Sequence, residues 1–193
     1  MLPLFKDAIK SAQPFPHLRV SEILRHEDAD QVLRWLREKA PWKLTVTDFY
    51  EQYEFSLLDS TRAPGAERLV ELSFIKTICT ELKRIFEVEE ELDLVDVTAH
   101  KLTPGQTIRI HNDFLGLDET HRLLIQFNAG WEVSQGGLLM LFGADTPETL
   151  QTVLLPTHGS GFAFEISAKS FHAVSSIKAG ERYTLVYTFR RRA

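Results

Sequence analysis

Residues 107–113 read TIRIHND, and the alternation of apolar and polar side chains in this stretch predicts a β-strand. Successive strand residues point to opposite faces, so the two isoleucines face one way and Arg109, His111 and Asp113 face the other. Alternate residues of a strand lie about 6.6–6.8 Å apart, which lets one imidazole and one carboxylate reach the same metal ion. Because a His-X-Asp pair is common by chance, a metal site at this stretch requires further ligands.

The same alternation continues on both sides of this stretch. Short alternating runs separated by turn-forming residues predict about eight strands, at 94–102, 107–113, 122–128, 137–142, 151–155, 161–166, 171–175 and 182–190. Many short, closely spaced strands are typical of a sandwich or barrel and not of a doubly wound parallel sheet. Residues 92–190 are therefore expected to form the β-rich core.

The first 91 residues have a different, partly helical pattern. Apolar residues recur at helical spacing in 28–40 and 66–86, which predicts two helices. Further expectations are a short helix and an extended lead-in within 1–16, strands in 17–24 and 44–58, and a loop at 59–65. Helices first and strands later predict an α+β fold, in which residues 1–91 support the β-core.

Composition limits the class of protein. The chain has 193 residues, of which 44% are hydrophobic and 25% charged, which is typical of one globular domain. Its net charge of −5 disfavours a general nucleic-acid binder. No run approaches the ~18 apolar residues of a membrane span, and the first residues lack a signal-peptide pattern. We therefore expect no nucleic-acid or membrane partner and a cytoplasmic location. The single cysteine, Cys79, excludes an intrachain disulfide and is expected to be a core residue.

Two later positions add to the candidate metal site. His172 lies in a predicted strand well after Asp113. Two histidines and one carboxylate leave one face of a metal open, which is typical of non-haem Fe(II) oxygenases, with zinc as the chemical competitor. Arg182 and Thr184 share one side of the last predicted strand, where a guanidinium and a hydroxyl form a good receptor for a carboxylate. An oxygenase that binds a dicarboxylic co-substrate needs this receptor, whereas a zinc hydrolase does not.

Together these motifs resemble the Fe(II)- and 2-oxoglutarate-dependent oxygenases, specifically the prolyl-4-hydroxylase-like branch. The resemblance covers about residues 95–190 and is carried by the segments 111–113, 128–131, 136–138, 170–174 and 180–184. It implies a double-stranded β-helix, or jelly-roll, core. It also implies that His111, Asp113 and His172 hold Fe(II) and form the catalytic centre.

The resemblance further implies the co-substrates and the reaction. Arg182, helped by Thr184, would bind the distal carboxylate of 2-oxoglutarate, and Gln126 is a candidate for bonding a co-substrate oxygen. With dioxygen, such an enzyme hydroxylates an unactivated C–H bond and releases succinate and CO2, and ascorbate is a further expected cofactor. The presence of Asp113 favours hydroxylation over halogenation. Arg109 stands where many family members have tyrosine, which leaves the substrate class open.

Several alternatives stay open at this point. The prime substrate is either a peptidyl residue, such as proline in a protein, or an amino-acid-derived small molecule. A non-catalytic jelly-roll of the cupin type, which binds a metal or small ligand, is the alternative to an enzyme, and a zinc hydrolase is the third reading.

Other polar and aromatic residues receive more ordinary interpretations. His100, His121, Arg122 and His158 are expected to be core, loop or turn residues, Trp131 and the pair Gly136-Gly137 to be structural, and Tyr50, Gln52 and Tyr53 to flank the mouth of the site.

Overall fold

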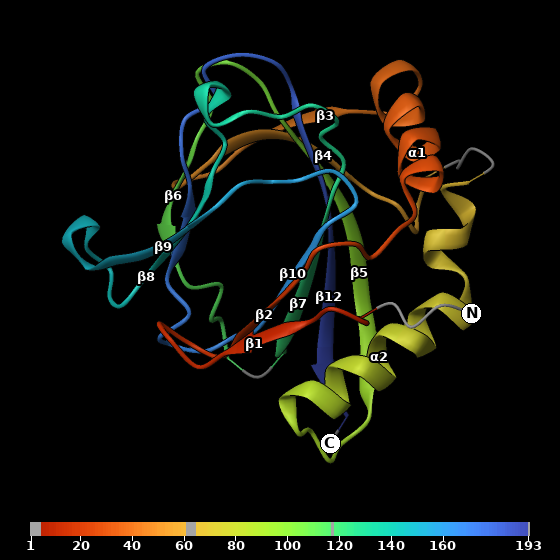
Figure 1. Cartoon of the computed structure of the whole chain (residues 1–193), viewed down its shortest axis with the longest axis vertical. Coiled ribbons are helices and arrows are strands. Elements are labelled where there is room, and N and C mark those ends of the chain that lie inside the picture. Colours follow the sequence, from red (N-terminus) through yellow and green to blue (C-terminus); the bar gives the residue numbers. More distant parts are fainter. Residues whose placement is uncertain (1–4, 61–64, 117, 193) are drawn as a thin grey trace.

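The computed structural model describes residues 5–60, 65–116 and 118–192. Its strands form two antiparallel sheets, one of eight strands and one of four. In Figure 1 both helices lie on one side of the larger sheet, and the smaller sheet lies on the other. This arrangement confirms the predicted α+β fold with a jelly-roll core.

The larger sheet contains, in order across it, β1 (Ile9–Ser11), β2 (His17–Val20), β10 (Gly161–Glu165), β7 (His121–Gln126), β12 (Arg182–Arg191), β5 (Leu92–Leu102), β4 (Glu51–Ser56) and β3 (Lys43–Val46). The smaller sheet contains β6 (Ile108–His111), β11 (His172–Val174), β8 (Leu139–Phe142) and β9 (Leu150–Leu154). The helices are α1 (His26–Glu38) and α2 (Leu72–Phe86), and three 3-10 turns are η1 (Glu67–Val70), η2 (Val133–Gln135) and η3 (Pro147–Thr149).

Strand β12 shows how the larger sheet separates two cores. Its odd-numbered residues from Tyr183 to Phe189 pack with the helices in one hydrophobic cluster. Val186 belongs to a second cluster, between the two sheets. Since side chains alternate along a strand, Arg182, Thr184 and Thr188 share the face of Val186 and point toward the smaller sheet. The helices therefore cover one face of the sheet and leave the other for the site.

The two helices form where apolar residues recur every three or four positions. In α1 the buried face includes Val32, Leu33 and Leu36, and in α2 it includes Ile78 and Leu82. The helix expected over 66–86 is divided, because extended backbone at its residue 71 separates η1 from α2. No helix among the described residues is long and apolar enough to cross a membrane.

The N-terminal segment differs from expectation. Residues 5–16 contain a turn and β1 in place of the short helix predicted within 1–16. Pro14 and Pro16 lack the backbone N–H that a helix needs, and they follow β1 directly. Residues 17–24 form only the short strand β2, and 44–58 form the hairpin β3–β4. The predicted loop at 59–65 lies partly outside the described residues.

Packing of α2 predicts a stability effect. Leu82 is fully buried against the larger sheet. We expect Leu82→Ala to lower the free energy of unfolding by about 2–5 kcal/mol, through lost burial and a residual cavity. Urea denaturation measures this change. Lys76→Ala on the exposed side of the same helix is the control, expected within about 0.5 kcal/mol. Equal effects of the two substitutions would contradict the packing of α2 on the sheet.

Candidate active site

Antiparallel pairing of β6 with β11 places His111 directly opposite His172. The two ring centroids lie 4.2 Å apart. The Nδ1 of His111 lies 2.8 Å from the carbonyl oxygen of Arg109, and the Nδ1 of His172 lies 2.8 Å from that of Ser170. Because a carbonyl oxygen only accepts, each Nδ1 carries the proton. This leaves both Nε2 atoms as free ligand nitrogens.

Asp113 closes the group from the end of the same strand. Its φ of 61° lies in the left-handed region, which is uncommon for residues other than glycine. Asp113 Oδ1 lies 3.3 Å from the Nε2 of His111, and Oδ2 lies 3.4 Å from the Nε2 of His172. The ligand atoms of the three residues all lie within 4.8 Å of one another. The structure therefore brings the three predicted ligands to one point.

The protonation states suit a metal. Burial alone would raise the pKa of Asp113, but Arg122 and the two histidines outweigh it and hold this pKa well below its usual range. Burial and the neighbouring His111 lower the pKa of His172. An ionised carboxylate and an unprotonated imidazole are the forms that bind metal ions. Two nitrogens and one carboxylate oxygen fit Fe(II), with the rest of the coordination sphere open to other ligands.

Ser170 ties the two ligand strands together. Its hydroxyl donates to the carbonyl oxygen of Asn112 at 2.7 Å and accepts from the backbone N–H of Ser167 at 3.0 Å. Ser170 is fully buried and precedes His172 by two residues. The sequence predicted no role for this serine beyond its place in the segment 170–174. The structure shows that it joins the ends of the two strands that carry the ligands.

Arg182 lies inside the barrel, and its side chain has no hydrogen-bond partner in the described part of the chain. It is 3% exposed, and its Nε and Nη2 are buried with no hydrogen-bond partner among the described residues. Burial lowers the pKa of Arg182 to about 10, so the guanidinium stays charged at neutral pH. A buried, unpaired cation is costly unless an anion accompanies it. The buried guanidinium of Arg182 therefore suits a bound carboxylate.

The other two predicted co-substrate residues face the same interior. Thr184 lies opposite Gln126 across β12 and β7, and its hydroxyl donates to Gln126 Oε1 at 2.9 Å. His100 lies opposite Thr184 on the other side. Burial, together with the charges of Arg122 and Arg182, lowers the pKa of His100 to about 3, so its ring is neutral. His100 thus borders the site, whereas the sequence favoured a core or surface role.

Arg122 is the neighbour of the metal ligands that sequence reasoning missed. Its Nε lies 3.3 Å from Asp113 Oδ2, and its Nη2 donates to Glu119 Oε2 at 2.8 Å. The sequence favoured a solvated loop end for this residue. The available signal was its spacing from Gln126, because residues four apart on a strand share a face.

The strand that carries His111 is irregular, and this corrects the expectation for Arg109. Between the pairs Ile108–Val174 and His111–His172, β6 has one more residue than β11. The extra residue breaks the alternation. Ile108 packs against the inner core and Arg109 is exposed. The prediction that Arg109 shares one polar face with His111 and Asp113 is therefore wrong.

The remaining polar residues have local partners. Trp131 donates to the carbonyl oxygen of Gly136 at 2.9 Å, and Gly136 has a φ of 71° with no room for a Cβ beside the carbonyl oxygen of Ser176, which confirms their structural roles. His158 lies in a turn and contacts Asp30 of α1 at 3.1 Å.

Residues flanking the mouth and the core were also expected from the sequence. Tyr50 pairs with Ile108 beside the metal ligands, Gln52 is buried, and the ring of Tyr53 lies under Lys101. His121 is fully buried, whereas Cys79 is only partly buried and packs against the edge of the core, where burial raises its pKa to about 11.

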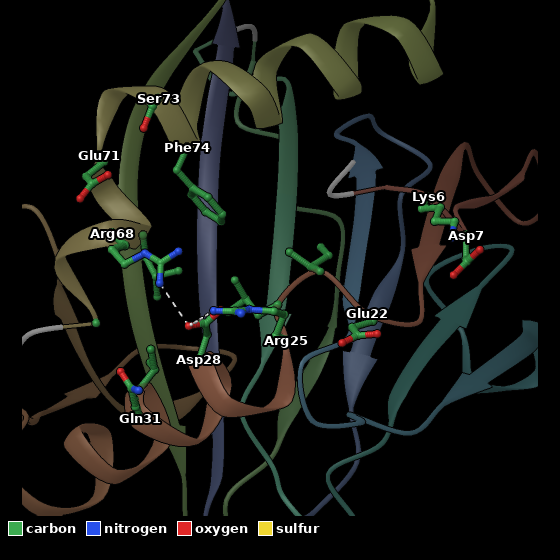
Figure 2. A pocket seen from close by; sticks show the side chains of 15 residues that line it. Lys6, Asp7, Glu22, Arg25, Asp28, Gln31, Arg68, Glu71, Ser73 and Phe74 are labelled. Carbon is green, nitrogen blue, oxygen red and sulfur yellow. Dashed lines mark hydrogen bonds and ion pairs between the residues drawn. The ribbon is translucent and has the colours of Figure 1, made fainter. Parts of the chain in front are cut away.

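A separate pocket lies between the beginnings of α1 and α2. Figure 2 shows that Arg25 and Arg68 both point to Asp28, with which each forms an ion pair. These charged groups therefore satisfy one another, and the pocket contains none of the predicted ligands.

Comparison with known proteins agrees with this geometry. A model of the 2OG-Fe(II) oxygenase superfamily matches residues 97–190, which include every predicted metal and co-substrate residue. No curated protein sequence is significantly similar to the chain.

Solved structures with the same fold include three prolyl hydroxylases. A prolyl-4-hydroxylase from Pseudomonas putida is 18% identical over 92% of this chain and 93% of its own, with a TM-score of 0.73. A prolyl hydroxylase from Trichoplax adhaerens, in complex with a hypoxia inducible factor peptide, is 13% identical over 91% and 83%, with a TM-score of 0.74. A viral collagen prolyl hydroxylase from Paramecium Bursaria Chlorella virus-1, in complex with 2OG, is 17% identical over 91% and 96%, with a TM-score of 0.65.

At these identities the solved structures establish the fold, and the match to the family model indicates the class of chemistry. The match over the β-core and the shared fold together support an iron- and 2-oxoglutarate-dependent dioxygenase similar to the prolyl hydroxylases.

Proposed function

We propose that this oxygenase is a hydroxylase in which His111, Asp113 and His172 hold Fe(II) and Arg182 binds the distal carboxylate of 2-oxoglutarate. The observation that carries the proposal is the buried, unpartnered guanidinium of Arg182 in the same barrel interior as the three ligands. Ascorbate as an external reductant and a cytoplasmic location belong to the proposal as well.

The chain's own residues supply ligation, charge and shelter. When bound, the iron with 2-oxoglutarate and dioxygen supplies the oxidising power, and 2-oxoglutarate leaves as succinate and CO2. His111 and His172 present their Nε2 atoms because their Nδ1 atoms are held by backbone carbonyls. The rings of Phe164 and Phe49 lie 4.9 Å from those of His172 and His111, respectively, so each histidine ring packs against an aromatic side chain.

The wall of the larger sheet beside Arg122 bears on the prime substrate. Thr188 lies opposite both Arg122 and Asp96 in neighbouring strands, so the three side chains share the interior face. Asp96 accepts hydrogen bonds from Ser56 at 2.7 Å and Thr98 at 2.9 Å. This polar wall supports a prime substrate that carries polar groups near the reacting carbon. A peptidyl residue and an amino-acid-derived small molecule both meet this requirement.

The alternative functions explain Arg182 poorly. A cupin-like binding protein or a zinc hydrolase needs no unpaired cation buried in the same interior as the metal ligands. The proposal as a whole is tested by loading the protein with Fe(II) and 2-oxoglutarate without oxygen and then admitting air. We expect succinate to form, and faster with the right substrate from a panel of peptides and free amino acids. No succinate above a metal-free control across the panel would contradict an oxygenase activity.

Removing one ligand should weaken metal binding strongly. We expect His172→Ala to weaken Mn(II) binding by more than the ~10–100-fold that loss of an outer-shell partner costs, because a ligand itself is lost. Isothermal titration with Mn(II) measures this affinity without turnover. His26→Ala, an exposed histidine of α1, is the control and should bind Mn(II) like the parent. Parent-like binding by His172→Ala would show that the ligand set is wrong.

Removing the Arg182 guanidinium should affect the co-substrate and spare the metal. A charge-assisted hydrogen bond contributes about 1.5–3 kcal/mol, so Arg182→Leu should weaken 2-oxoglutarate binding to the Mn(II) protein by roughly tenfold to a few hundredfold. Arg182→Lys should fall between, since it keeps the charge and loses the planar fork. Calorimetric titration with 2-oxoglutarate tests this, with Arg109→Leu as the control. If Arg109→Leu lost affinity for 2-oxoglutarate and Arg182→Leu kept it, Arg109 would be the carboxylate receptor and the assignment to Arg182 would be wrong.

A further inference from the structure

The ion pair between Arg122 and Asp113 links one oxygen of a metal ligand to β7 of the larger sheet. Arg122 Nε and Asp113 Oδ2 lie 3.3 Å apart. Both atoms are buried, and neither has a hydrogen-bond partner among the described residues, so the contact is electrostatic and not a formed hydrogen bond. Each atom therefore retains its hydrogen-bonding capacity for the other.

Glu119 holds the guanidinium in this position. Its Oε2 accepts from Arg122 Nη2 at 2.8 Å, and it comes from the loop that joins the metal-binding strand to β7. The side chain of Arg122 is only 22% exposed, and that of Asp113 only 8%. Arg122 is thus restrained from one side by Glu119 and faces Asp113 on the other.

The two oxygens of Asp113 consequently have different surroundings. Oδ1 lies beside the Nε2 of His111, at 3.3 Å. Oδ2 faces both Arg122 and His172. A carboxylate that gives both oxygens to one metal occupies two coordination positions, whereas one restrained through its second oxygen occupies one. The difference matters because a 2-oxo acid that chelates a metal needs two adjacent open positions.

We propose that Arg122 is a positioning residue, which holds Oδ2 of Asp113 away from the metal so that the coordination positions needed by 2-oxoglutarate stay open. The inference rests on the proposed metal site. Arg122 would then influence the affinity for 2-oxoglutarate without contacting the metal or the co-substrate itself.

The proposal predicts opposite changes in two affinities. In Arg122→Met a cation leaves the neighbourhood of the metal and Asp113 is released. We expect Mn(II) binding to be unchanged or tighter, and 2-oxoglutarate binding to the Mn(II) protein to weaken by about 10–100-fold, the range for outer-shell partners. A merely structural role would weaken both affinities together. Unchanged 2-oxoglutarate affinity in Arg122→Met would overturn the proposal.

Glu119→Gln separates positioning from simple charge. This substitution removes a negative charge, so long-range electrostatics alone would tighten binding of the 2-oxoglutarate dianion. Because it also releases Arg122, the proposal expects weaker 2-oxoglutarate binding. Tighter binding in Glu119→Gln would overturn the proposal. Arg122→Lys should restore part of the loss in Arg122→Met.

The control and the reference distinguish this inference from the proposed function. Arg34→Met removes the same charge from an exposed position on α1, away from the strands that carry the ligands, and should leave both affinities unchanged. If the parent protein fails to bind Mn(II), or binds 2-oxoglutarate without a need for metal, the proposed function fails. If the parent binds Mn(II) and then 2-oxoglutarate, and Arg122→Met has the same two affinities, the inference about Arg122 fails while the proposed function stands.

Discussion

The site depends on the antiparallel pairing of β6 with β11, which sets His111 opposite His172 at a ring distance of 4.2 Å. The pairing alone would leave two imidazoles free to rotate. Backbone carbonyls two residues before each histidine hold the Nδ1 atoms, and Ser170 joins the two strand ends. The metal ligands are thus oriented mainly by main-chain groups, which are rigid because they belong to the sheets or the turns between them.

The larger sheet offsets the free-energy cost of burying polar side chains, because it separates the apolar core beneath the helices from the interior between the sheets. One face is packed with the helices, and most of the apolar burial of the chain lies there or in the second cluster between the sheets. The interior face can therefore carry polar side chains at one end of the barrel. Helices and site are linked because β12 contributes alternate residues to the helix-covered core and to the interior face.

Two arginines in the same interior have different roles because their charged neighbours differ. Arg122 is balanced by Asp113 and Glu119, and belongs to the part of the site that holds the metal ligands. Arg182 has no such balance, and its charge is available to an incoming carboxylate. Their residue type is the same, so only their surroundings distinguish a residue that organises the protein from one that awaits a ligand.

The sequence by itself determined the parts that depend on local periodicity and residue chemistry. Apolar spacing predicted α1 and α2, alternation predicted most strands of the β-core, and the residue types His, Asp, His and Arg predicted the metal and carboxylate chemistry. Two features were not predicted from the sequence. The 66–86 helix is divided because one residue has extended backbone, and 1–16 contains a short strand because nearby prolines disfavour a helix.

Only the tertiary structure decided which polar groups meet. The extra residue in β6 depends on its register with β11, and it exposes Arg109 although local alternation places that side chain beside His111. The contact of Arg122 with Asp113 joins β7 of the larger sheet to the end of β6 in the smaller sheet, so it depends on how the two sheets pack against each other. Arg182 stays unpartnered because no described residue of the neighbouring strands places a hydrogen-bond acceptor beside its buried nitrogens. These are non-local properties, because they follow from hydrogen-bond register and packing between segments that are distant in the sequence.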